Sequence, residues 1–161
     1  IFSYNRTVSS LNDLTSEEFL LQIEKSFTLK KSTEAYCPKS LHNLSMYFGE
    51  SWYSLTIKDE FIDNENPVGC LDAQLLSTLV LSPILGIHDL KTDNRVNFIE
   101  GTKGMEALQE SVDSNIAKVA FGFFPVSIEQ LKRVADTNNI MPPKSTWIEP
   151  KIRSGLTVFE F

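Results

Sequence analysis

The segment from 140 to 155, IMPPKSTWIEPKIRSG, concentrates side chains that bind anions, in a protein whose net charge is −6. Arginine presents a planar pair of donors to phosphate or carboxylate, whereas lysine supplies a mobile point charge. We predict that the basic and hydroxyl side chains of this segment converge on one anion. The predicted set is Lys144, Ser145, Thr146, Lys151 and Arg153.

Prolines in the same segment restrict the backbone around these donors. Pro142, Pro143 and Pro150 lower the conformational entropy that would be lost when the donors are held around an anion. A second interpretation stays open, in which a rigid loop pairs its charges with surface carboxylates such as Glu149. The sequence contains neither a Walker A loop nor a GxGxxG, so it has no standard nucleotide motif.

Two smaller groups of polar residues are secondary candidates for the anion site. Asn5 and Arg6 lie in a strand-like start, where we expect them at a sheet edge, with the strand that would face them outside this chain. Asp93 and Arg95 follow Asp89 in a polar turn. An Asx-type turn with a local ion pair also explains this turn.

The cysteines and histidines do not have the spacing of a metal site, and we predict none. Cys37 and Cys70 are isolated, so we expect both to be small buried apolar groups in a reducing compartment. His42 and His88 are expected to be surface or hydrogen-bonded side chains. No signal peptide is present, which together with the cysteines predicts a cytoplasmic protein.

Charge and hydropathy argue against two classes of partner. Binding along duplex DNA relies on clustered lysine and arginine, and the acidic balance makes nucleic acid an unfavourable partner for this domain. The longest apolar run, from Leu75 to Leu85, is too short and too polar to span a bilayer. We therefore expect no membrane partner.

Capping patterns predict two of the helices that must position these residues. Thr15 with Glu18, and Ser127 with Gln130, are both capping boxes, and the second helix is expected to run to about Asp136. Two more helices are expected at 71–81, where leucines recur at helical spacing, and at 104–112.

Apolar and alternating runs predict the strands. Residues 46–48 and 52–57 flank a short turn at Gly49, which is a hairpin signal. The nearly continuous apolar run at 119–124 favours a central strand. Further strands are expected at 1–8, shortly after 28, at 95–99 and at 155–161.

Together these elements predict one α+β domain over 1–161, with a mixed, partly antiparallel sheet flanked by helices. Its phenylalanine-rich core should contain Phe19, Leu75, Phe121 and Phe123. Because the chain starts without Met and directly as a strand, we expect a domain of a longer protein.

Several motifs are shared with a known family. They are Tyr4-Asn-Arg-Thr-Val8, Pro83-Ile-Leu-Gly-Ile87, Met141-Pro-Pro-Lys-Ser-Thr-Trp147 and Glu149-Pro-Lys151 with Arg153-Ser-Gly155. Through them the whole chain resembles the C-terminal half of the conserved prokaryotic family of unknown function 1015. Ile148 departs from the family, which more often has Phe there.

The resemblance implies a longer protein whose N-terminal half is the partner of this domain. That half carries an Asp-Gly-His-His-Arg signature and is similar to the ParB and sulfiredoxin superfamily, which includes a free-serine kinase. The resemblance thus implies a phosphotransfer enzyme for a small metabolite such as serine, using ATP or ADP with magnesium. This domain would be inactive alone and would bind an anionic metabolite or a nucleotide. The alternative is a regulatory domain of a ParB-like partition or sporulation regulator, which binds DNA or a protein.

Overall fold

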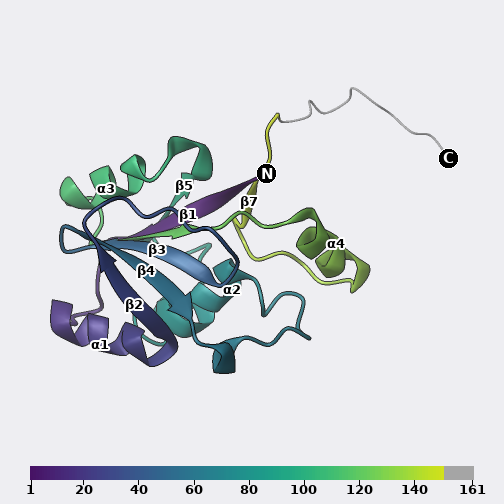
Figure 1. The fold of residues 1–161 in the computed structure, drawn as a ribbon, viewed down its shortest axis with the longest axis horizontal. Helices are drawn as coiled ribbons and strands as arrows, with labels where there is room; N and C mark the ends of the chain where they lie inside the picture. The colour runs from purple at the N-terminus through teal and green to yellow at the C-terminus, as the bar shows by residue number, and fades with distance from the viewer. Residues whose placement is uncertain (151–161) are drawn as a thin grey trace.

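The computed structural model describes residues 1–150 of the chain. Their strands form one antiparallel sheet (Figure 1). Its strands are β1 (Phe2–Val8), β2 (Phe27–Ser32), β3 (Asn43–Phe48), β4 (Ser51–Ile57), β5 (Val96–Glu100), β6 (Val119–Phe123) and β7 (Thr146–Trp147). Six strands follow the order β2-β4-β3-β6-β1-β5, and β7 pairs with the start of β1. All pairings among the described strands are antiparallel.

Helices cover both faces of the sheet. They are α1 (Ser16–Ser26), α2 (Asp72–Leu76), the π-helical turn η2 (Ser77–Leu81), α3 (Glu106–Asp113) and α4 (Ile128–Asp136), with short 3-10 turns η1 (Asp59–Phe61) and η3 (Gly101–Lys103). In Figure 1, α1 and α2 lie on one side of the sheet and α3 on the other. The predicted α+β domain with flanking helices is confirmed.

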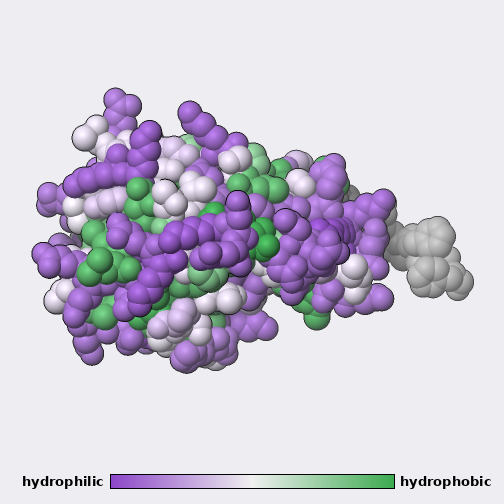
Figure 2. Space-filling model, turned by 60° about the horizontal axis from the view of Figure 1, so that its bottom comes forward, coloured by the Kyte–Doolittle hydropathy of each residue, from purple (hydrophilic) through white to green (hydrophobic). Residues whose placement is uncertain are grey.

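The core lies mainly between the sheet and the layer of α1, α2 and η2. Phe19, Leu75, Phe121 and Phe123 are exposed by only 0%, 4%, 0% and 5%, as predicted. Burial of such side chains contributes about 1.5–3 kcal/mol each. On the surface in Figure 2, hydrophilic residues predominate, with apolar patches between them, which is ordinary for a folded domain.

A smaller cluster lies under α3 on the opposite face. Tyr47 and Trp52 pack there beside Leu108. The Tyr47 hydroxyl donates to Asp113 at 2.8 Å, and burial raises the pKa of Tyr47 to about 12. Aromatic bodies with one anchored polar tip suit this position between sheet and helix.

Both predicted capping boxes are confirmed. The Thr15 hydroxyl accepts from the Glu18 amide, and the Glu18 carboxylate accepts from the Thr15 amide. Ser127 and Gln130 make the same reciprocal pair at the start of α4. Two amides that a helix terminus leaves unpaired are satisfied at each site.

The helix predicted over 71–81 changes type at Ser77, which the sequence did not indicate. In a continuous α-helix the Ala73 carbonyl would accept from the Ser77 amide. Here it accepts from Nη1 of Arg6 and from the Ser77 hydroxyl, and the Ser77 amide donates to Gln74 instead. A side chain inserted into the helical ladder thus explains the π-helical turn.

The expected edge position of Asn5 and Arg6 is wrong. β1 lies inside the sheet between β6 and β5, and both residues are completely buried. The strands that face them belong to this chain: Arg6 is opposite Phe98 on β5 and Phe121 on β6. Polar residue types had suggested an edge, but their neighbours are supplied by distant segments.

Smaller differences concern single residues and short segments. Cys70 is buried as expected, but Cys37 is exposed. The pairing of β7 with Phe2 and Ser3 was not predicted. The strand expected at 155–161 lies outside the described residues.

Candidate functional site

Two cavities meet beside the segment that the sequence singled out for anion binding. Their volumes are about 400 Å³ and about 380 Å³, and both are lined by Leu90 and Pro143. We call the pair the Pro143 cleft. Volumes of this order are typical of sites for small ligands.

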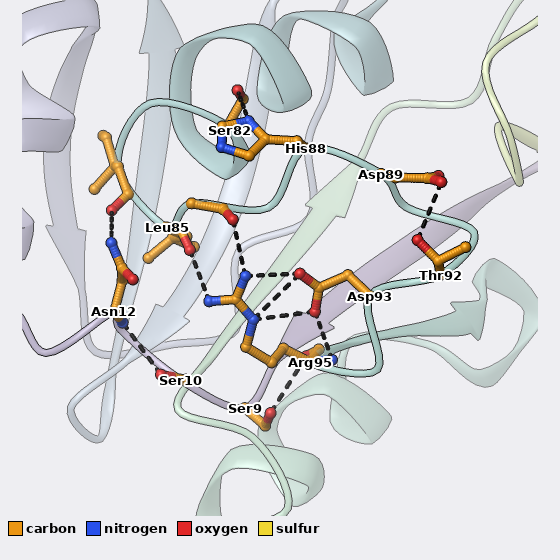
Figure 3. Close-up of polar contacts among 12 residues, drawn as sticks. Ser9, Ser10, Asn12, Ser82, Leu85, His88, Asp89, Thr92, Asp93 and Arg95 are labelled. Carbon is orange, nitrogen blue, oxygen red and sulfur yellow. Dashed lines mark hydrogen bonds and ion pairs between the residues drawn. The ribbon is translucent and has the colours of Figure 1, made fainter.

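Hydroxyl and cationic side chains line the Pro143 cleft. Ser77, Thr78, Ser82 and His88 line the larger cavity, and Ser82 Oγ lies 2.8 Å from Nδ1 of His88 (Figure 3). The second cavity is lined by Phe98 and two lysines, Lys91 and Lys144. Cations and hydroxyls beside an apolar wall can hold an oxyanion attached to an organic body.

One carboxylate, that of Asp89, also lines the cleft, and its oxygens are already engaged. They accept from the Lys91 amide at 2.9 Å. They also accept from the Thr92 hydroxyl at 3.0 Å, as Figure 3 shows. These two hydrogen bonds hold the pKa of Asp89 below its usual value. Within residues 1–150, Asp89 forms no ion pair with Lys91 or Lys144, the two lysines of the second cavity. Both ammonium groups therefore remain available to an anion.

Lys144 is placed by the pairing of β7 with β1. Its backbone has a φ of 51°, after which Thr146 pairs with Ser3. The Lys144 ammonium lies 5.1 Å from the centre of the Tyr4 ring, and the side chain is exposed. A cation–π contact at an exposed site contributes about 0.5–1 kcal/mol, so the ammonium is held but can still turn towards a ligand.

Arg6 lies next to the cleft, below its surface. Nη1 donates to the Ala73 carbonyl at 2.7 Å and to the Ser77 hydroxyl at 2.9 Å. The guanidinium carbon lies 5.9 Å from the Phe98 ring centre and 5.5 Å from that of Phe123. Phe98 and Ser77 are also walls of the cleft, so the structure connects this secondary candidate with Lys144.

The other secondary pair is fully occupied with itself and the backbone. Arg95 meets Asp93 at 2.6 Å and donates to the carbonyls of Leu85 and Gly86 (Figure 3). The Asp93 carboxylate also accepts from the Arg95 amide. The interpretation as an Asx-type turn with a local ion pair is confirmed. Through its two carbonyl hydrogen bonds, Arg95 also fixes the loop that ends at Gly86.

Of the remaining predicted residues, those within 1–150 are not gathered around Lys144. The buried Ser145 donates to the Pro142 carbonyl at 2.6 Å and lines a different, narrow cavity. Thr146 is half-buried in β7. The carbonyl oxygen of the Asn5 side chain accepts from the Phe123 amide. Lys151 and Arg153 lie outside the described residues.

Sequence reasoning missed the hydroxyls of 77–82, which were assigned to an ordinary helix. The signal was present as polar residues at 77, 78 and 82 that interrupt an apolar run. Pro143, rather than its charged neighbours alone, joins the two cavities. A proline in a basic segment was interpreted only as a backbone restraint.

Metal-binding and membrane-spanning features are both absent from the described part of the chain. Residues 1–150 contain no group of three or more His, Cys, Asp or Glu side chains arranged to hold a metal ion. No helix within the same range has the length and hydropathy required to cross a membrane.

The fold and the cleft define an α+β domain with a candidate anion site at one side of an antiparallel sheet. Residues 1–74 match the model of a family described as "Protein of unknown function (DUF1015)", which supports the resemblance to that family over this part of the chain. The match ends within α2, before β5 and β6. No curated protein and no solved structure matches the chain significantly.

Proposed function

We propose that this domain binds a small phosphate- or carboxylate-bearing metabolite in the Pro143 cleft. In the proposal it is the C-terminal companion of a catalytic half related to the ParB and sulfiredoxin superfamily. The full-length protein would be a cytoplasmic phosphotransfer enzyme that uses ATP or ADP with magnesium on a metabolite such as serine.

One observation carries the proposal: two lysines from separate segments line one cleft of an acidic protein, and a third cation is buried against its walls. Lys91 follows the loop after η2, Lys144 precedes β7, and Arg6 on β1 contacts two of the cleft's walls. Because the net charge is −6, the protein as a whole repels an anion at long range. A local group of cations with hydroxyls is therefore the best-supported anion site.

Lys144→Met tests the cleft directly. Methionine keeps an apolar stem over Tyr4 but removes the ammonium, so we expect the Kd for inorganic phosphate or O-phosphoserine to rise about three- to tenfold. Isothermal titration calorimetry on the chain of residues 1–161 measures this change. Lys25→Met, on the exposed end of α1, is the matched control and should leave the Kd unchanged. Equal affinity of the wild type and Lys144→Met would remove Lys144 from the site.

The phosphotransfer step requires the full-length protein. Incubation with ATP or ADP, magnesium and serine should produce phosphoserine, which phosphorus NMR distinguishes from the nucleotide. No turnover across a panel of small hydroxyl metabolites would contradict the enzymatic proposal. A salt-sensitive shift of duplex DNA by the full-length protein would instead favour the regulatory alternative.

A further inference from the structure

Arg6 lies where three cavities approach one another. Four groups contact its guanidinium: the Ala73 carbonyl, the Ser77 hydroxyl and the rings of Phe98 and Phe123. Ser77 and Phe98 line the two cavities of the Pro143 cleft. Ala73 and Phe123 line the third, whose volume of about 10 Å³ is near that of a single water site.

The segment Pro143–Ser145 borders the same three cavities, and we call it the cover segment. Pro143 lines both cavities of the cleft, Lys144 lines the second, and Ser145 lines the third. The cover segment is held by the Ser145 hydrogen bond to Pro142 and by the contact of Lys144 with Tyr4. The first contact is with a residue three positions away and the second involves an exposed side chain, so both can break without unfolding the sheet.

The unused donors of Arg6 lie on one edge of its guanidinium. Nη1 is engaged, whereas Nε and Nη2 are buried and have no hydrogen-bond partner among residues 1–150. Nε–H and Nη2–H point in parallel from a planar group, in the geometry that binds two oxygens of one carboxylate or phosphate. No carboxylate of the described residues forms an ion pair with Arg6.

Leaving this cation unpaired has a free-energy cost. Burial lowers the pKa of Arg6 to about 10, which still leaves the side chain protonated at neutral pH. The two aromatic rings and the two hydrogen bonds of Nη1 offset part of the cost of desolvation. An anion bound to the remaining edge would supply the missing counter-charge.

We propose that Arg6 is the primary anchor of the anion site, and that displacement of the cover segment lets one oxyanion bind Nε and Nη2 together. The inference rests on the proposed function and adds to it the residue and the binding geometry. Lys144, carried by the cover segment, then closes over the bound anion. The ligand class is a carboxylate or phosphate with two free oxygens, from a diffusible metabolite or from a carboxylate side chain of the rest of the protein.

Arg6→Met tests this assignment because it removes the charge and keeps an unbranched apolar side chain between the rings. The Ala73 carbonyl keeps its bond from the Ser77 hydroxyl, so no buried acceptor is left without a partner. Without ligand, we expect the Tm of Arg6→Met to equal or exceed that of the wild type. We expect its Kd for inorganic phosphate to rise at least about tenfold.

Arg95→Met is the matched control, because Arg95 already has its counter-charge in Asp93. Its expected behaviour is the reverse: a lower Tm and an unchanged Kd for phosphate. If Arg6→Met also had a lower Tm and an unchanged Kd, the inference would be overturned. Arg6 would then have a structural role, like Arg95. The proposed function would survive that result if Lys144→Met still weakened binding, whereas no binding by the wild type would overturn both.

A second measurement does not depend on the folding of Arg6→Met. In the wild type, phosphate should shift the Nε–H resonance of Arg6 in a nitrogen–proton NMR spectrum, and Arg6→Lys assigns that resonance by its absence. An Nε–H resonance that stays fixed while phosphate binds would overturn the inference.

Titration of the full-length protein separates the two sources of the anion. Phosphate binding to both forms indicates a diffusible ligand, and binding to residues 1–161 alone indicates a carboxylate from the rest of the protein.

Discussion

His42 and Asp72 join two parts of the chain that are far apart in sequence. The buried Asp72 carboxylate accepts from the His42 amide at 3.0 Å and lies 3.1 Å from its Nδ1. The hydrogen bond to Asp72 raises the pKa of His42, while partial burial acts in the opposite direction. His42 also has a φ of 62°, which the carboxylate helps to hold.

The stability of the protein should therefore depend on the protonation of His42. Because the folded pKa is raised, the contribution is fully present below the unfolded value of about 6.5 and is lost as pH rises through the folded value. We expect His42→Asn to lower the free energy of unfolding more at about pH 5.5 than at about pH 8.5. Asparagine tolerates positive φ, so backbone strain changes little.

Denaturant unfolding of both proteins at the two pH values measures this difference. In an Asp72→Asn background the pH dependence of the His42→Asn effect should disappear, since the carboxylate that favours the charged imidazole is gone. If the His42→Asn effect instead grew towards high pH, the folded pKa of His42 would have to lie below its unfolded value.

Single residues were predictable where their partners are close in sequence. The Asp93–Arg95 pair and the caps at Thr15 and Ser127 depend on neighbours within three positions. Arg6 was misplaced because its burial depends on Ala73 and on strands that follow it much later. The residue types around Arg6 do not predict contacts with residues so far away in sequence.

At the scale of elements, the two capping boxes allow a matched test. Thr15→Ala and Ser127→Ala each remove a hydroxyl that accepts from an amide in the first helical turn. Each substitution should lower the stability of its helix by about 1 kcal/mol. Because α1 packs Phe19 and Ile23 into the main core, Thr15→Ala should reduce the global free energy of unfolding by that amount.

Ser127→Ala should act more locally. Among the described contacts, α4 buries only Val134 of its own residues, so its helix can fray without opening the sheet. Hydrogen exchange should therefore accelerate in α4 while the global unfolding midpoint changes little. An equal loss of global stability in both variants would show that α4 is part of the cooperative core.

The helix at 71–81 marks the limit of periodicity as a predictor. Leucine spacing correctly placed the buried face of α2 and η2, with Leu75, Leu76 and Val80 in the core. The same spacing did not reveal that Arg6 bonds to the Ala73 carbonyl and interrupts the α-helical ladder. Periodicity reports which face is apolar, whereas hydrogen-bond register also depends on tertiary contacts.

For the whole molecule, the class of fold and the central strand followed from sequence, and the order of strands did not. The apolar run of β6 indicated a central strand, and β6 indeed lies between β3 and β1. The short turn after Phe48 predicted the β3–β4 hairpin. β1 pairs with β5 and β6, which are distant in sequence. The alternation of apolar and polar residues predicts a strand but not which strand it pairs with.

The same topology predicts that the family-matched segment is not an independent folding unit. A fragment of residues 1–74 contains the β2-β4-β3 sheet but lacks the three strands that pair with β1 and the last two residues of α2. It would leave the buried Arg6 and Val8 exposed to solvent. We expect circular dichroism to show no cooperative thermal transition for 1–74, in contrast to 1–161.

The outcome for a fragment of residues 1–123, which includes β5 and β6, provides the comparison. This fragment should regain cooperative unfolding, although it lacks α4 and the cover segment. A sharp transition for 1–74 would mean that β1 can be stabilised without the strands that pair with it.

The interior place of β1 also sets an order of events during folding. This strand leaves the ribosome before the other strands of the sheet, yet Arg6 must wait for Phe98 and then for Phe121 before it is enclosed. The β3–β4 hairpin, whose strands are adjacent in sequence, can form much earlier. Long-range pairing of this kind slows folding, because the chain must close large loops before those contacts form. The nascent chain therefore carries β1 without its neighbours through most of the synthesis of this domain, until β5 and then β6 emerge to flank it.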